Sequence, residues 1–578
     1  MQQRAYIILA IFFFTFFEVR HSRAQDLERV GGDNPVSVSG GFSTDQVMYF
    51  SDGINNRRDP YNFFFTGNLN IDLYGLSMPL SFSYSNQQFA YRQPFNQIGI
   101  SPTYKWATGH FGYRNLSYSR YTLNGHIFFG GGLELEPSDR WKVEVMYGRL
   151  NRAIEPNEEG ALPFYRRMGT GIKASYRVKN TELMIIGFGA WDDPSSLSII
   201  PDSLGVTPEE NMVLSVGLKQ KLMDNLSLEV EAARSSYTRD LRAPEHDGLR
   251  STVDHLFIPT RRTNTTFYNA MNARLGYDFS FMNIGVRYER IDPEYRTLGA
   301  YFFNNDLENI TLDASTQLFE SALSINGHFG FQRDNLADQK ATGMERMVGS
   351  LNVAWIASDK LNLNASYSNF QSFVNVIPVE QQLTQATPYD NFDTLNYVQI
   401  AQNAMINGSY RIKSTKKASS MVSLNGSFQQ TDDQQGTVAA LGPSSRMYNM
   451  NGMYNHSLSQ QNITFGAGLN TNITETMGAS NNLYGVSASI GKAFFEKKLK
   501  TQASVNMNRT FFEDQLTGSI LNCRINGNYV VAEKHRINVH LTYINRVRMQ
   551  QQGAERRGEY YAFSFNELTV RGGYSYRF

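Results

Sequence analysis

The sequence predicts an all-β protein: a large antiparallel transmembrane β-barrel of about 22–26 strands without a plug domain. Three observations predict this fold class. Long runs alternate between apolar and polar residues, and no later stretch reaches the 18 apolar residues of a helical span. Long and short connections also alternate along the chain. Each observation is weak alone, and together they describe a closed sheet that crosses a bilayer.

The alternation is clear in strands such as 226–232, 361–368 and 537–543, where Leu, Ile, Val or Tyr occupies every second position. The positions between them hold Ser, Asn, Glu, His or Thr. Each run has about 10–16 residues, which is the length that a tilted strand needs to cross a bilayer and protrude a little. Strands of soluble proteins average only about 5–6 residues. The length therefore favours membrane-spanning strands.

Twenty-six runs of this kind follow one another from Val36 onward. In order, they are near 36–48, 61–74, 78–89, 98–107, 111–121, 125–135, 140–150, 166–178, 181–191, 211–222, 226–238, 264–279, 282–291, 308–319, 320–332, 345–357, 361–373, 395–412, 417–430, 446–458, 461–473, 482–495, 499–512, 516–531, 534–548 and 561–578.

The connections support an even count, with 26 the best value. The longest are 49–60, 151–165, 192–210, 239–263, 292–307, 374–394, 431–445 and 549–560, and every one follows an odd-numbered run. Connections after even runs are tight, as at 179–180 and 358–360. Barrels of this class place long loops outside the cell and short turns in the periplasm. We therefore expect both chain termini on the periplasmic side.

The composition narrows the class further. Hydrophobic residues make up 41% and aromatic residues 13% of the chain, yet the mean hydropathy is negative. The formal net charge of +1 and the lack of a basic patch argue against a nucleic-acid partner. Cys523 is the only cysteine, so an internal disulfide and a thiolate metal cluster are excluded. We expect no cofactor and no metal.

Residues 1–24 are predicted to be a secretory signal peptide. Arg4 supplies the basic start, 6–17 is an apolar run too short to span a bilayer, and 22–24 places small residues before a cleavage site at Gln25. The alternative is an uncleaved anchor. The remaining chain divides into a short periplasmic segment, 25–35, and the barrel, 36–578.

The final run carries a resemblance to a known class. Tyr574, Tyr576 and Phe578 lie on one side of the strand with Leu568 and Val570, and polar residues and Arg571 occupy the other side. An aromatic strand closed by a C-terminal Phe resembles the last strand of bacterial outer-membrane β-barrels. Tyr574, Tyr576 and Phe578 would then form the signal that the barrel assembly machinery reads. The rich use of Tyr, Phe, Asn and Gly resembles barrels of Bacteroidota.

This resemblance implies a place in the outer membrane of a Gram-negative cell, in contact with membrane lipid and lipopolysaccharide. The predicted outer loops are acidic, and carboxylates there either bind cations that bridge lipopolysaccharide or are simply solvated. These residues are Glu155, Glu158, Glu159, Asp192, Asp193, Asp202, Glu209, Glu210, Asp432 and Asp433.

Alternation sends one set of charged side chains toward the lumen, because an Arg or Lys facing lipid at the bilayer midplane costs about 2–4 kcal/mol. The set comprises Lys142, Glu144, Lys173, Arg177, Lys219, Glu229, Glu231, Arg274, Arg287, Arg411, Arg524 and Arg571. Its basic balance predicts either a pore that favours anions or side chains that pair with one another and stabilise the wall. The sequence leaves both alternatives open.

The connection 292–307 differs from the other loops because it carries Tyr295, Tyr301, Phe302 and Phe303. Such a segment is too apolar to be freely exposed. It either folds into the barrel mouth, as the candidate occluding loop, or contacts another molecule.

Catalytic motifs are absent, so we expect no enzyme. A barrel of about 26 strands encloses a lumen too wide for side chains to fill. The sequence therefore predicts a gated or occluded passage for large polar cargo or protein export. The alternative is a non-conducting barrel that anchors or scaffolds a surface or periplasmic partner.

Overall fold

A computed structural model describes residues 36–87, 94–156, 163–198, 205–246, 261–338, 345–369, 372–375, 397–431, 445–476, 478–551 and 560–578. The expected signal peptide 1–24 and the segment 25–35 lie outside these residues, as do parts of several long connections. None of the described helices is long and apolar enough to cross a membrane.

The described chain is built almost entirely of strands. They are β1 Val36–Asp52, β2 Tyr61–Leu73, β3 Leu76–Ser85, β4 Gln97–Ile100, β5 Thr103–Tyr104, β6 Ala107–Asn115, β7 Ile127–Ser138, β8 Trp141–Asn151, β9 Arg166–Val178, β10 Thr181–Asp193, β11 Glu210–Met223, β12 Leu226–Thr238, β13 Thr265–Asp278, β14 Met282–Ile291, β15 Leu307–Leu318, β16 Leu323–Arg333, β17 Glu345–Ser358, β18 Leu361–Ser368, β19 Ser372–Asn375, β20 Tyr397–Ser414, β21 Ala418–Thr431, β22 Ser445–Leu458, β23 Ile463–Thr476, β24 Ala479–Phe494, β25 Leu499–Phe512, β26 Gln515–Ala532, β27 His535–Gln551 and β28 Tyr560–Arg577. One 3₁₀ turn, η1, spans Pro194–Ser196.

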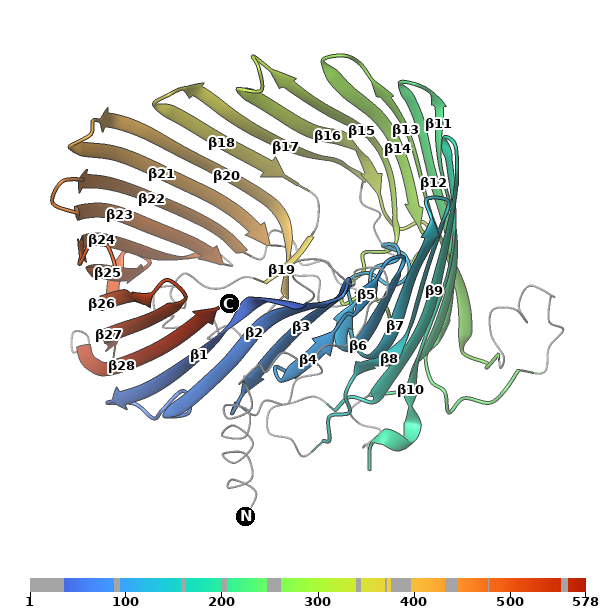
Figure 1. The fold of residues 1–578 in the computed structure, drawn as a ribbon, viewed down its shortest axis with the longest axis horizontal. Coiled ribbons are helices and arrows are strands. Elements are labelled where there is room, and N and C mark those ends of the chain that lie inside the picture. The colour runs from blue at the N-terminus through green and yellow to red at the C-terminus, as the bar shows by residue number, and fades with distance from the viewer. Residues whose placement is uncertain are drawn as a thin grey trace.

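These strands form one closed antiparallel barrel (Figure 1). Each strand pairs with its neighbours in the chain, and β28 returns to pair with β1. β4 and β5 are two parts of one barrel strand, because both lie between β3 and β6. β18 and β19 likewise share the partner β20. The barrel therefore has 26 strands, and the even count expected from the connections is confirmed.

The two faces of the sheet differ as a period of two requires. On β10, Leu183 and Ile185 point outward and are 48% and 62% exposed, whereas Ile186 and Phe188 point inward and are buried. Following the cross-strand pairs around the barrel places most of the exposed large apolar residues on the outer face and most of the charged residues on the inner face. An apolar outer face on a closed barrel is what a lipid environment requires, because closure leaves no strand edge without hydrogen bonds.

The expected strand near 111–121 is wrong in its extent. β6 begins at Ala107 and ends at Asn115, and 116–126 is a connection. The residues from Leu116 to Leu123 do not alternate cleanly, because several of their apolar side chains are buried inside the barrel instead of facing lipid. A long connection therefore follows the fifth barrel strand as well. We use the term loop rim for the end of the barrel that carries 116–126 and the other connections after odd-numbered barrel strands.

The seam between β1 and β28 joins residues more than 500 positions apart. Inside the barrel, Arg571 Nη2 lies 2.9 Å from Asp45 Oδ1. Outside, the Phe42 ring is 5.8 Å from Tyr576 and 6.3 Å from Phe578. The backbone N–H of Phe578 donates to Gly40 at 3.0 Å. The last residue thus contributes both a ring contact and a hydrogen bond to closure.

We predict that Phe578→Ala lowers the heat-modifiable, folded fraction of the protein without reducing its synthesis. The Phe578 ring is available for recognition before the seam closes, and it packs on Phe42 and Tyr576 afterwards. The fraction is read from the mobility of unboiled samples. Phe331→Ala is the matched control, because Phe331 is also exposed on the outer face but lies on β16. Equal folded yields for the two variants would contradict a special role for the terminus.

Cys523 provides a second check on the register. It alternates with Asn522 and Arg524 on β26 and pairs across the sheet with Val505 and Tyr543, which are on the outer face. We expect a maleimide confined to the bilayer to label the native thiol, and a water-soluble maleimide to leave it unlabelled. Rapid reaction with the soluble reagent would mean that β26 is displaced by one residue, which inverts every side chain of the strand.

Candidate functional site: two loops packed inside the barrel

Two connections of the loop rim fold inward and cover part of the inner wall. The first inner loop, 116–126, joins β6 to β7, and the second inner loop, 292–306, joins β14 to β15. Tyr121 and Leu123 of the first loop and Tyr295 of the second are fully buried. Loops normally lie on the surface, so burial of large apolar side chains here marks a packed core within the lumen.

One cluster of this core holds the two loops together against β11–β15. Tyr121 and Tyr295 meet edge to face with ring centroids 6.3 Å apart, and Phe303 lies 5.1 Å from Tyr295. They pack on Val213, Ala233, Ala270, Ile291 and Leu307 of the wall. These wall side chains all point inward, where a membrane barrel normally places polar residues.

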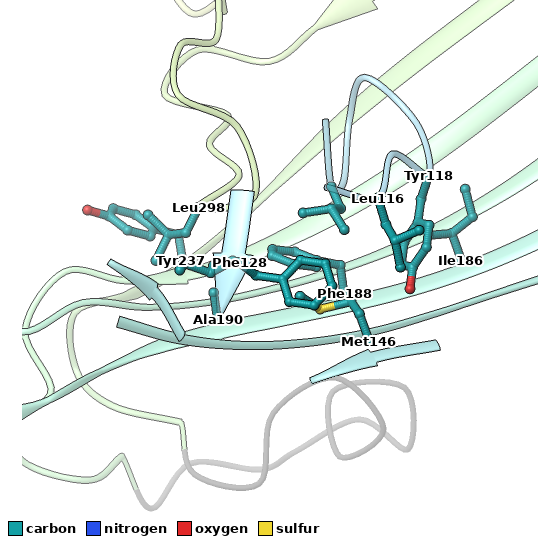
Figure 2. Packing of buried hydrophobic residues seen from close by; sticks show 11 residues of the cluster. Leu116, Tyr118, Phe128, Met146, Ile186, Phe188, Ala190, Tyr237 and Leu298 are labelled. Atoms are coloured by element: carbon teal, nitrogen blue, oxygen red, sulfur yellow. The ribbon is translucent and has the colours of Figure 1, made fainter. Parts of the chain in front are cut away.

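The second cluster lies against β7–β10 and includes Tyr237 of β12 (Figure 2). Leu116 and Tyr118 of the first inner loop and Leu298 of the second pack with Phe128, Met146, Leu150, Ile186, Phe188, Ala190 and Tyr237. Glycines of the wall make room for this contact. A Cβ atom at Gly171 would lie 2.7 Å from Cε2 of Tyr118, and the Tyr118 hydroxyl donates to the Gly171 carbonyl at 3.2 Å. The glycines that interrupt these strands therefore allow close approach of the loop.

Backbone and side-chain hydrogen bonds join the two loops directly. The Tyr295 hydroxyl donates to the Tyr121 carbonyl at 2.9 Å, and the Thr297 hydroxyl donates to the Thr122 carbonyl at 2.6 Å. The Asn124 N–H donates to the carbonyl of Gly299 at 2.9 Å. These contacts link segments about 175 residues apart in the chain, so the loops form one unit.

The wall supplies polar partners for the second inner loop. The Asn211 side chain accepts from the Leu298 N–H at 3.1 Å and donates to the Arg296 carbonyl at 3.2 Å. Ser235 donates to the same carbonyl at 2.6 Å. The Arg296 guanidinium lies 3.1 Å from Glu209. The Arg296 carbonyl and the Leu298 N–H are therefore satisfied inside the lumen, as burial requires.

A buried carboxylate anchors the first inner loop. Glu289 on β14 accepts a hydrogen bond from the Tyr121 hydroxyl at 2.8 Å and lies 2.5 Å from the Arg120 guanidinium. Burial, together with the charge of Glu289, raises the pKa of Tyr121 well above its usual value. Burial also raises the pKa of Tyr295. Both hydroxyls therefore stay protonated and act as donors at physiological pH.

The residues expected to occlude the lumen have different environments. Tyr295 is buried and Phe303 is partly buried, whereas Tyr301 and Phe302 are 47% and 42% exposed. Tyr301 stacks on His126 with ring centroids 4.2 Å apart, and its hydroxyl accepts from the Ile127 N–H at 3.2 Å. The second inner loop thus has a buried side and an exposed aromatic tip.

The inward charged residues lie on the inner face, and seven of the twelve form ion pairs. Lys142 is 2.8 Å from Glu136, Lys173 is 3.2 Å from Glu144, and Arg177 is 2.9 Å from Glu182. Arg274 and Arg287 share Asp313 at 2.9 and 3.6 Å, and Arg571 pairs with Asp45. These contacts favour the alternative in which the charges stabilise the wall.

The other predicted lumen residues are dispersed. Lys219 lies across from Glu182 and Glu229 in the register, and Glu231 accepts a hydrogen bond from Ser215 at 2.6 Å. Arg411 precedes a bulge in β20, and Arg524 lies on β26 across from Ser504 and Thr542. These residues do not form a single ring.

Of the acidic residues expected in outer loops, Asp192 and Asp193 instead end β10, and Glu210 begins β11. Asp192 and Glu209 bind Arg167. Glu158, Glu159, Asp202, Asp432 and Asp433 lie outside the described residues.

The opposite wall, from β18 to β25, has a different lining that sequence reasoning missed. Inward asparagines pair directly across successive strands, in the order Asn364, Asn407, Asn425, Asn451 and Asn470. Asn470 then reaches over Gly485 and donates to Asn508 at 2.9 Å. A Cβ atom at Gly485 would lie 1.9 Å from Asn508 Oδ1, so only glycine fits between them. We call this set the asparagine row.

The first inner loop was also missed, although signals for it exist in the sequence. Phe128-Phe129 and Met184-Ile185-Ile186 place apolar residues on both faces of a strand. A strand with lipid outside and water inside needs only one apolar face. Apolar residues on both faces therefore indicate that another part of the chain covers the inner one.

Among the described residues, no group of three or more His, Cys, Asp or Glu side chains could hold a metal ion. The chemistry that the site offers is packing, hydrogen bonding and ion pairing.

No family model and no curated protein matches the sequence. Several solved structures are partly similar to this barrel. The FrpB iron transporter from Neisseria meningitidis is 9% identical in sequence and has a TM-score of 0.37. The match covers 93% of this chain and 82% of that chain. The P pilus usher (PapC) translocation pore has 9% identity, coverage of 93% and 98%, and a TM-score of 0.37. Pseudomonas aeruginosa OpdK with vanillate has 8% identity, coverage of 64% and 94%, and a TM-score of 0.28. Likeness at this level carries no argument about cargo.

The assignment of the architecture rests on the geometry of the barrel itself. A closed antiparallel barrel of 26 strands with an apolar outer face has the architecture of an outer-membrane β-barrel.

We predict that acid loosens the first inner loop through His126. Burial lowers the pKa of His126 to about 4 from 6.5, although a hydrogen bond with the Ile127 carbonyl opposes the shift. The packed loop disfavours the charged imidazole ring. The stability of the packed loop is therefore full above pH 6.5 and falls by about 1.4 kcal/mol per pH unit as the pH drops toward 4. Hydrogen exchange of 116–126, corrected for intrinsic rates, measures this change.

The control is His126→Gln, which cannot titrate. We expect exchange of 116–126 in this variant to depend much less on pH. The same steep pH dependence in both proteins would show that the effect does not come from His126.

Proposed function

We propose that this protein forms a passage for large polar cargo across the outer membrane of a Gram-negative cell, and that the two inner loops hold it shut. The observation that carries the proposal is the core inside the lumen, in which Tyr121 and Tyr295 are fully buried against inward-facing apolar wall residues. A plain wall needs no such core, whereas a closed gate does.

The size of the barrel supports occlusion. Barrels of about 16–18 strands already leave an aqueous channel, and 22-stranded transporters carry a plug. A fully open barrel of 26 strands would breach the membrane barrier. In this chain the inner loops lie against β7–β15, and they come from connections of the loop rim. A gate built from connections can move without breaking the barrel.

The opposite wall supports a polar cargo. The asparagine row presents amide groups that both donate and accept hydrogen bonds and carry no net charge. The ion pairs of Lys142, Lys173, Arg177, Arg274, Arg287 and Arg571 reduce the free charge of the wall elsewhere. We therefore propose weak charge selectivity in place of a strongly anion-selective pore.

A second candidate function is a non-conducting barrel that anchors or scaffolds a partner. The exposed aromatic tip of the second inner loop favours it, because Tyr301 and Phe302 remain 47% and 42% exposed at the loop rim. A surface partner could bind this tip, either as the scaffolded protein or as the trigger that opens the gate. Neither function requires catalysis, and we propose that the protein is not an enzyme.

We predict that Gly299→Val raises the conductance of the purified barrel in planar lipid. A Cβ atom at position 299 would lie 2.6 Å from the Thr122 carbonyl oxygen and 2.7 Å from the Phe188 ring. The valine must therefore push the two inner loops apart and away from the wall. Single-channel recording should show more frequent or larger openings than in the native protein.

Gly189→Val is the matched control. Gly189 lies on β10 next to Phe188 but faces outward, where an added Cβ would be 3.7 Å from Thr170. We expect native conductance from it. A second variant, with 295–305 replaced by a short glycine linker, tests the gate without relying on one substitution. If both loop variants fold into closed, silent barrels, the scaffold function is correct and the passage is not.

A further inference from the structure

The outer face of β18–β25 carries a large apolar hollow. Its volume is about 960 Å³, and its lining includes Ile406, Leu424, Met450, Leu469, Val486 and Met507. All six are outward-facing and exposed, from 44% at Met507 to 68% at Leu469. Ligand pockets commonly have volumes of about 300–1,000 Å³. The hollow is therefore large enough for a ligand and lies on the opposite side of the wall from the asparagine row.

Glycines create the hollow. Gly408, Gly426 and Gly452 lie on the outer face and pair across the sheet with large apolar residues of the next strands. Added Cβ atoms at Gly426 and Gly452 would lie 3.2 Å from Ile406 and from Leu424, respectively. The floor of the hollow at these glycines is therefore backbone without side chains. The neighbouring large apolar side chains form the walls of the hollow.

A cation lies at one end of the hollow. Arg509 is outward-facing on β25, it lines the hollow, and it pairs directly across the sheet with Tyr484. It is exposed and forms no ion pair or hydrogen bond with the residues that the structure describes. Arg509 lies three residues before the end of β25, which finishes at the loop rim. An arginine facing lipid near an interface is tolerated, and it can bind a negative headgroup there.

We propose that this hollow is a binding site for a phosphorylated acyl lipid of the outer leaflet. Arg509 binds the phosphate, the Tyr484 hydroxyl donates a hydrogen bond, and the acyl chains lie over Gly426 and Gly452. The proposal rests on the proposed function in one respect, the placement of the loop rim at the cell surface.

Lipid is favoured over a protein partner by the surroundings of the hollow. Within a bilayer, two apolar protein surfaces gain no hydrophobic free energy by association, because lipid tails are equally apolar. A hollow there must nevertheless be filled, and flexible acyl chains can follow its shape. The single unpaired cation matches a phosphate at the level where headgroups begin.

The experiment is native mass spectrometry of the full-length barrel in detergent with three probes. They are lipid A with its phosphates, the same lipid dephosphorylated, and inorganic phosphate alone. We expect phosphorylated lipid A to bind most tightly. Arg509→Gln should weaken its binding about tenfold or more, as expected for loss of a hydrogen bond to a charged group. The dephosphorylated lipid should be affected little.

Two further variants complete the design. Gly426→Val fills the hollow with a residue that strands favour, and it should weaken both lipids. Arg234→Gln is the matched control, because Arg234 is an outward arginine near the loop rim on β12, beside Phe267 and far from the hollow. It should bind like the native protein.

Equal binding of both lipids by the native protein, unchanged by Arg509→Gln, would overturn the proposal, as would unchanged binding by Gly426→Val. Binding of inorganic phosphate alone at similar strength would also overturn it, because the hollow would then be irrelevant. Conductance is not part of this readout. Silent barrels from both loop variants, together with the expected lipid series, would refute the gate and leave the lipid site standing.

Discussion

Closure of the sheet is the constraint on which the rest of the structure depends. In lipid, every backbone N–H and C=O must find a partner within the protein, and a sheet meets this demand only when its last strand joins its first. Here the join is between β28 and β1, where Arg571 meets Asp45 inside and Phe42 meets the terminal aromatic residues outside. Once 26 strands are closed in this way, the protein encloses more space than its inward side chains can fill.

The protein fills part of that space with a core that belongs to no strand. The inner loops bring Tyr121, Leu123 and Tyr295 against the wall. There the wall carries apolar residues on its inner face, which would otherwise contact water. The barrel is consequently two-sided: β7–β15 resemble the interior of a soluble protein, and β18–β25 keep an amide lining. Where the inner face carries charges, ion pairs such as that between Lys173 and Glu144 join neighbouring strands.

Alternation and connection length were enough to predict the barrel, its even strand number and the outward face of Cys523, because a period of two fixes the face of every residue in a strand. They could not predict the fate of 116–126. The apolar alternation of a segment indicates which of its faces is apolar, but not which distant segment packs on it. Leu116 and Tyr118 are buried against residues such as Ile186 and Leu298, which lie much later in the sequence. The asparagine row was missed for a similar reason, since it becomes visible only when the register aligns one asparagine from each strand.

The distance along the chain between the two inner loops has a consequence for assembly. The hydroxyl of Tyr295 must find the carbonyl of Tyr121, 174 residues earlier. The first inner loop can pack on β7–β10 early, but the cluster that joins the two loops cannot form until β14 has taken its place. Until then, Val213, Ala233 and Ala270 of β11–β13 lack the cover of Tyr295. Any factor that assists insertion would therefore meet the apolar inner faces of β11–β13 before the second inner loop covers them.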